Sequence, residues 1–164
     1  MVLSTVLKAS SDRHVGMGQI AIGCGPTNLT AVLGSCLAVT MHSPKHEIGI
    51  LAHVILAQSG GRDSPPGKYA DTAVIEMLRM MENANVPRKA IVARLAGGAN
   101  IFGRTGPLQI GDANIKAVTQ SLDAAGIAVK AQDVGGNKGR RVSLDCRTGS
   151  LTIEMAGSPA RVLQ

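Results

Sequence analysis

The chain has 164 residues, which fits a single domain and is long enough to bury a full hydrophobic core. Hydrophobic residues make up 45% of the composition but aromatic residues only 1%, which argues against nucleic-acid modules that stack bases on aromatic side chains. The formal net charge of +6 favours acidic partners by steering their encounter with the protein, although charge alone does not choose between nucleic acid and an acidic protein surface.

The cysteines and the apolar segments together indicate a cytoplasmic protein. Cys24, Cys36 and Cys146 form an odd set without a CxxC pair, which is typical of neither a disulfide framework nor a zinc site. The first residues lack the apolar core of a secretory signal, and no stretch approaches the length of a membrane span. We therefore expect no membrane insertion and a reducing, cytoplasmic setting.

The first third of the chain is predicted to be mostly β-strand. Residues 1–13 are polar and unpatterned, so we expect a flexible N-terminal tail there. Short apolar segments bounded by turn residues predict four strands. They lie at 15–22, 28–33, 37–41 and 47–57.

The last two of these strands suit an antiparallel hairpin around a four-residue turn at 43–46. If the hairpin closes symmetrically around that turn, Cys36 lies directly opposite His53 on one face, with Cβ atoms about 4.5–5.5 Å apart. The same register places His42 beside Glu47 as a closing charge pair. This register therefore predicts that the Cys36 thiol lies next to the His53 imidazole.

This pairing makes Cys36 a candidate nucleophile and His53 a candidate base. Gly34 and Ser35 precede the thiol; the glycine allows substrate to approach the backbone closely, and backbone amides at such a bend can form an oxyanion site. The alternatives are a buried structural cysteine and a hydrogen-bonded core histidine. A single bulge in the hairpin would also send the two side chains to opposite faces.

The remainder of the chain is predicted to contain two helices and further strands. A helix at 68–83 has Asp71 as its N-cap and an apolar stripe, and a second at 112–125 ends before Gly126, which suits a left-handed C-terminal cap. Strands are predicted at 90–95, 127–131, 141–144 and 151–155, loops at 58–67 and 103–106, and a flexible C-terminal tail at 158–164. Strands with two inserted helices and no linker indicate a single α+β domain.

Three other patterns favour structural roles. The glycine-rich segments at 97–98 and 135–140 lack the spacing of a phosphate loop, so we interpret them as turns. His42 and His46 have the spacing of helical metal ligands, but Pro44 between them excludes a helix, and we expect solvated turn histidines. A basic cluster forms a solvated face or holds an acidic partner. It contains Lys138, Arg140, Arg141 and Arg147.

Six segments in order resemble the CheD family of bacterial chemoreceptor glutamine deamidases. They are 33–39 (LGSCLAV), 52–56 (AHVIL), 66–73 (PGKYADTA), 96–102 (AGGANIF), 110–114 (IGDAN) and 133–137 (DVGGN) with Arg140. The resemblance implies a deamidase domain at 14–157. It also implies layered, sandwich-like mixed sheets flanked by two main helices, similar to the catalytic domain of cytotoxic necrotising factor toxins.

The resemblance also implies the chemistry and the partners. Cys36 is expected to be the nucleophile, His53 the general base and acid, and Thr30 the third member that orients the imidazole, with no metal or organic cofactor. The expected substrates are specific glutamines of methyl-accepting chemotaxis receptors, converted to glutamate through a thioester with release of ammonia. The alternative is a non-catalytic regulatory partner of a CheC-like phosphatase, and nucleic acid is not expected as a partner.

Overall fold

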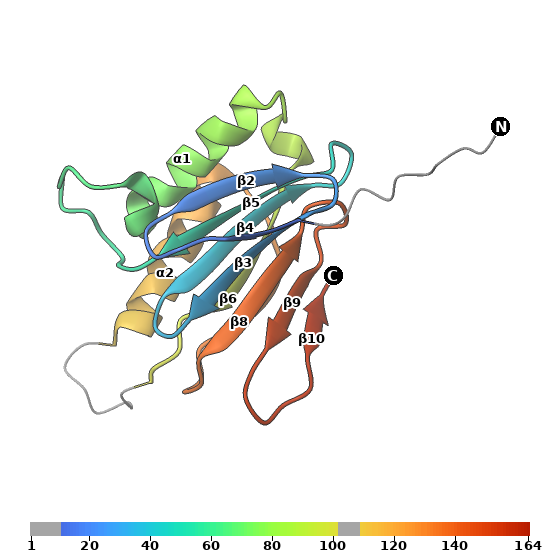
Figure 1. Cartoon of the computed structure of the whole chain (residues 1–164). Helices are drawn as coiled ribbons and strands as arrows, with labels where there is room; N and C mark the ends of the chain where they lie inside the picture. The colour runs from blue at the N-terminus through green and yellow to red at the C-terminus, as the bar shows by residue number, and fades with distance from the viewer. Residues whose placement is uncertain (1–10, 102–108) are drawn as a thin grey trace.

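Two five-stranded sheets face one another, and two helices cover the outer side of one of them (Figure 1). The computed structural model describes residues 11–101 and 109–164. The predicted loop at 103–106 and the first ten residues of the predicted N-terminal tail lie outside these ranges. No helix in the described ranges has the length and apolar character to cross a membrane.

The sheet that carries the helices, called here the helix-covered sheet, has the strand order β2-β5-β4-β6-β7. Its strands are β2 (Ile20–Cys24), β5 (Ile48–Val54), β4 (Leu37–Ser43), β6 (Val92–Gly97) and β7 (Val129–Val134). The facing sheet, called the open sheet, has the order β1-β3-β8-β9-β10. Its strands are β1 (Ser11–His14), β3 (Thr27–Leu33), β8 (Arg140–Asp145), β9 (Leu151–Glu154) and β10 (Arg161–Leu163).

Both sheets are mixed, because the β1–β3 and β6–β7 pairs are parallel and the other pairs are antiparallel. The predicted α+β class with layered mixed sheets and two main helices is therefore confirmed. The predicted strand at 15–22 is wrong in its bounds, since β1 and β2 lie on either side of a turn. Residues 11–13 and 161–163, which we expected in tails, form strands that pair with β3 and β9.

The helices run as their apolar stripes predict. α1 spans Ala70–Asn83 and α2 spans Ile110–Ala125, with short 3₁₀ turns at Pro66–Lys68 and Arg88–Ala90. Gly126 caps α2 with a φ of 70°, which confirms the predicted left-handed cap.

The predicted N-cap of α1 is wrong, because Tyr69 occupies that position. The carboxylate of Asp71 instead accepts hydrogen bonds from the backbone amide and the hydroxyl of Ser59, at 2.9–3.1 Å. Asp71 therefore fastens the loop that follows β5 to the first turn of the helix.

Two hydrophobic layers result from the alternation of side chains along β4 and β5. Leu37, Val39 and Met41 of β4 pack toward the helices, whereas Ala38 and Leu51 pack toward the open sheet. Because successive side chains of a strand point to opposite faces, every second residue of these buried strands faces the interior between the two sheets. This inter-sheet face is where the candidate site lies.

The hairpin of β4 and β5 has a different register from the predicted one. Ser43 pairs with Ile48 and Ala38 pairs with His53, so the connecting turn is 44–47. Glu47 ends this turn in the left-handed region, with a φ of 49°. The turn is displaced by one residue, which shifts the pairing by two positions and places Ala38, not Cys36, directly opposite His53.

The predicted roles of the turn histidines need two corrections. His42 does not form a closing pair with Glu47 and is not solvated: it pairs with Gly49 in the ladder, is buried, and its Nε2 lies 2.9 Å from the Cys146 carbonyl oxygen. The His46 Nδ1 accepts a hydrogen bond from the Ser43 hydroxyl at 2.8 Å or donates one to it. Long-range packing across the sheets buried a side chain that its own sequence neighbours predicted to be exposed.

The predicted basic cluster is also divided by the fold. Arg140 is 5% exposed and its Nη1 donates to the Asp133 carboxylate at 2.6 Å, so it is a buried structural cation. Arg161 of β10 donates to the other oxygen of Asp133 at 2.6 Å. Lys138 and Arg147 remain exposed.

Candidate active site

Cys36 lies at the bend where the chain passes from β3 in the open sheet to β4 in the helix-covered sheet. The bend is held by the segment that follows β6. The Gly98 amide donates to the Cys36 carbonyl at 2.9 Å, and the Ala99 amide donates to the Gly34 carbonyl at 3.0 Å. The Cys36 side chain is half-buried and packs against the inter-sheet core.

Gly97 lets this segment approach the bend. Its φ is +107°, and a Cβ at this position would lie 2.5 Å from the Cys36 carbonyl oxygen. A side chain here would therefore both strain the backbone and displace the bend that carries the thiol.

We expect Gly97→Ala to destabilise the fold by about 1–3 kcal/mol and to lower activity as well. Gly135→Ala is the matched control, because Gly135 also has a positive φ, of +82°, but a Cβ there would meet nothing within 4 Å. Urea unfolding of both variants separates the shared backbone strain from the clash at the bend. Equal losses in the two variants would contradict the proposed role of the close approach.

His53 is 2% exposed and points from β5 into the inter-sheet space. Its Nδ1 lies 3.0 Å from the Val15 carbonyl oxygen. A carbonyl oxygen only accepts hydrogen bonds, so Nδ1 carries the proton in the neutral ring and Nε2 is the basic nitrogen. Nε2 is buried and has no hydrogen-bond partner within the described ranges.

Cys36 and His53 share one face of the helix-covered sheet in spite of the corrected register. Because side chains alternate with a period of two, a shift of two residues keeps both on the face they were predicted to share. Cys36 directly precedes β4, two residues before Ala38, which pairs with His53, and its side chain packs against the inter-sheet core.

Thr30 lies on β3 and is linked to the imidazole through Val15. The Val15 amide donates to the Thr30 carbonyl at 2.7 Å, and the Val15 carbonyl accepts from the imidazole. The Thr30 hydroxyl donates to the Arg13 carbonyl at 3.5 Å. The oxygen that orients the His53 ring is thus a backbone atom of Val15, which no side-chain pattern in the sequence indicates.

Burial keeps both candidate groups neutral at pH 7. It raises the pKa of the Cys36 thiol above its ordinary value of 9.0, and a hydrogen bond with the residue's own backbone opposes this shift. It lowers the pKa of His53 below 6.5; the hydrogen bond to Val15 opposes this shift, and the nearby His14 adds to it. The resting pair is therefore a thiol and a neutral imidazole.

Asn114 of α2, which ends one of the six segments of the resemblance but was not predicted as a site residue, joins the two segments of the site. Its Nδ2 donates to the carbonyls of Ser35 and Ile55, at 3.2 and 2.9 Å. A signal was available, because Asn114 shares a helical face with Val118 and Leu122 at a spacing of four residues, so an amide stands where an apolar side chain is expected.

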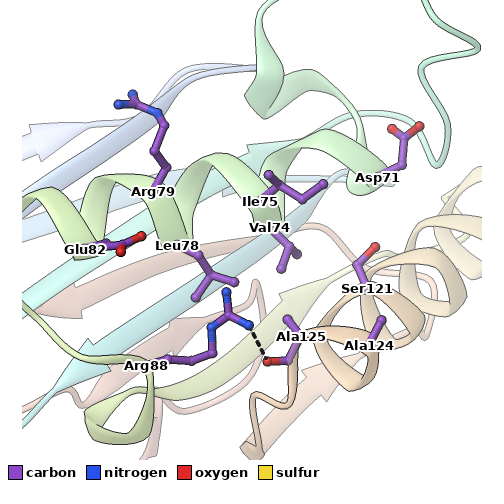
Figure 2. A pocket seen from close by; sticks show the side chains of 10 residues that line it. All are labelled: Asp71, Val74, Ile75, Leu78, Arg79, Glu82, Arg88, Ser121, Ala124 and Ala125. Carbon is purple, nitrogen blue, oxygen red and sulfur yellow. Dashed lines mark hydrogen bonds between the residues drawn. The ribbon is translucent and has the colours of Figure 1, made fainter.

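The groove between the two helices is a separate feature. It has a volume of about 480 Å³, and Figure 2 shows Leu78 of α1 and Ala125 of α2 among its lining residues. Arg88 borders it and donates to the Ala125 carbonyl at 3.3 Å. The helices cover the outer side of the sheet, whereas Cys36 and His53 face inward, so this groove does not lead to the thiol. No group of three or more His, Cys, Asp or Glu side chains in the described part of the chain could hold a metal ion.

Comparison with known proteins shows the family. The family described as "CheD chemotactic sensory transduction" matches residues 55–155. A "Chemoreceptor glutamine deamidase CheD" of Thermotoga maritima is 39% identical over 144 residues, which cover 87% of this chain and 91% of that protein. A "Probable chemoreceptor glutamine deamidase CheD" of Methanococcus vannielii is 40% identical over 141 residues, covering 85% of this chain and 92% of its own length. With a family match over more than half of its length, relatives of such identity and coverage, and the α+β fold described above, the chain belongs to the CheD family.

Proposed function

We propose that this protein is a cysteine-dependent deamidase that converts glutamine side chains of chemotaxis receptors to glutamate. The names of the two relatives supply the substrate class. The observation that carries the proposal is the pair on the inter-sheet face: a half-buried thiol at a glycine-containing bend beside a histidine whose basic nitrogen has no partner in the described chain.

The first half-reaction forms a thioester. His53 Nε2 takes the proton of the Cys36 thiol as the sulfur attacks the side-chain amide carbon of the glutamine. The amides of Ser35 and Cys36 donate to no other residue in the described ranges, and they stabilise the negative charge that develops on the carbonyl oxygen. Protonated His53 then gives its proton to the leaving nitrogen, and ammonia departs.

The second half-reaction restores the enzyme. His53 removes a proton from water, whose oxygen attacks the thioester carbon. The bond between carbon and sulfur breaks, glutamate forms, and the thiolate recovers the proton from Nε2. Thr30 acts through Val15: its carbonyl accepts from the Val15 amide and so holds the residue whose own carbonyl keeps the proton on Nδ1. The cytoplasm, where thiols stay reduced, suits this chemistry.

Mass spectrometry of a purified chemoreceptor cytoplasmic fragment tests the proposal directly. Incubation with the protein is expected to add about one mass unit at specific glutamines, because OH replaces NH₂, and to release ammonia in equal amount. The Cys24→Ala variant, which loses an exposed thiol on β2, is expected to behave like the natural protein.

An unchanged fragment would reject the deamidase and favour the second candidate, a regulatory partner of a CheC-like phosphatase.

A further inference from the structure

Asn114 occupies the junction between the nucleophile bend and the strand of the histidine. It is fully buried, although α2 offers a solvent face on which an amide would cost nothing. The first of its two acceptors, the Ser35 carbonyl, directly precedes Cys36. The second, the Ile55 carbonyl, follows His53 by two residues.

The side-chain amide of Asn114 therefore links the two segments. Both N–H groups of an –NH₂ are needed to reach two carbonyls at once. His53 lies within β5, which pairs with a neighbour on each side, whereas the residues 34–36 lie outside any strand. The bend is held by the segment that follows β6, and Asn114 adds a tie from the bend to the residue that follows β5.

The other half of the amide shows that this link is costly. Asn114 Oδ1 is buried without a partner in the described chain, and an unsatisfied buried acceptor lowers the stability of the fold. An apolar side chain would avoid that cost but could not donate, and an ionised aspartate would present only acceptors to the two carbonyls. The two donated hydrogen bonds are what an asparagine supplies here and those residues do not.

The packing around the helix end points the same way. A Cβ on Gly111 would collide with the Gly98 carbonyl oxygen, so α2 approaches the segment that braces the Cys36 carbonyl as closely as backbone permits. The helix end, the bracing segment and the bend form one packed unit, and the Asn114 side chain links this unit to Ile55, directly after β5.

We propose that Asn114 is a positioning residue that holds the Cys36 thiol where His53 Nε2 can take its proton. This inference rests on the proposed function, because it assumes that the thiol and the imidazole act as a pair. Asn114 itself is not expected to touch the substrate.

The test is the rate at which iodoacetamide alkylates Cys36 between pH 5 and pH 10, followed by mass spectrometry of the peptide that contains it. In the natural protein His53 is expected to assist the reaction near neutral pH, so His53→Ala should slow it there by about 10- to 100-fold and leave the alkaline limit unchanged. Asn114→Asp and Asn114→Ala are expected to reproduce that loss near neutral pH.

Two controls separate positioning from general stability. Ser121→Ala removes another hydrogen bond from α2 to the backbone, that of the Ser121 hydroxyl to the Ala70 carbonyl at 3.3 Å, and it should keep the natural pH profile. Cys146 is fully buried, and burial raises the pKa of its thiol to about 11, so its alkylation in the same sample reports global opening.

Each outcome has a distinct meaning. The positioning role would be overturned if the Asn114 variants kept the natural pH profile of Cys36 alkylation. It would also be overturned if Cys146 became reactive in these variants together with Cys36, because global opening would then explain the change. If His53→Ala instead has the same pH profile of Cys36 alkylation as the natural protein, the thiol–imidazole pair is rejected, and with it the mechanism of the proposed function.

Discussion

Replacing Cys36 by alanine is expected to lower kcat/KM for glutamine deamidation by about 10³-fold or more. The proposed reaction passes through a bond between the Cys36 sulfur and the glutamine carbon, so no other residue of the site can replace the thiol. The fold should tolerate the change, since the side chain is only half-buried and the hydrogen bonds that hold the bend, from the Gly98 amide to the Cys36 carbonyl and from the Ala99 amide to the Gly34 carbonyl, do not involve the sulfur.

The measurement is the initial rate of ammonia release from a receptor fragment, alongside thermal unfolding of each variant. Cys24→Ala provides the matched loss of a free thiol outside the site. If Cys36→Ala retained a rate within tenfold of the natural one, the nucleophile would have to be sought elsewhere. A Cys36→Ala variant that has lost deamidation but still supports full receptor signalling would indicate that the binding role dominates.

Replacing His53 by glutamine is expected to lower kcat/KM by about 10²- to 10⁴-fold, the usual contribution of a general base. Glutamine keeps a donor for the Val15 carbonyl but has no titratable nitrogen. The variant therefore tests proton transfer with little change in the packing between the sheets.

The pH dependence of kcat/KM provides a second test of His53 as the base. Burial lowers the pKa of His53 below 6.5, so the natural protein keeps its neutral base as pH falls through 6.5 and loses activity only when pH reaches the lower folded value. The acid limb of kcat/KM should therefore have its midpoint below 6.5 and should vanish in His53→Gln. An acid limb that persists unchanged in the variant would assign it to another group.

The same shift has a consequence for stability. Below pH 6.5 the unfolded chain binds a proton at this histidine before the folded chain does, so the free energy of unfolding falls as pH decreases from 6.5 toward the folded pKa of His53. This loss should be smaller in His53→Gln than in the natural protein, and urea unfolding over the same pH range measures it.

Periodicity and local chemistry are sufficient to predict several features of the structure from the sequence. The stripes of α1 and α2, the glycine cap at Gly126 and the presence of a hairpin from β4 to β5 all depend on residues close together in the chain. The common face of Cys36 and His53 also survived the error in register, because an even shift preserves the face.

Other features depend on contacts between distant segments. The hairpin register was decided by a turn that ends with Glu47 in the left-handed region, a conformation that the composition of the turn does not indicate. The polar neighbours of His42 and Arg140 in the sequence predict solvated side chains. In the structure both are buried: His42 contacts the Cys146 carbonyl, and Arg140 pairs with the Asp133 carboxylate.

By itself, then, the amino-acid sequence determined the helices, the fold class and the two residues that share the inter-sheet face, because these follow from patterns repeated along the chain. Only the tertiary structure decided that the Val15 carbonyl orients the imidazole of His53 and that Asn114 joins the bend to Ile55, directly after β5. Every residue has a backbone carbonyl oxygen, so the sequence does not indicate which one will accept a given hydrogen bond. A hydrogen bond between residues dozens of positions apart exists only once packing has brought them together.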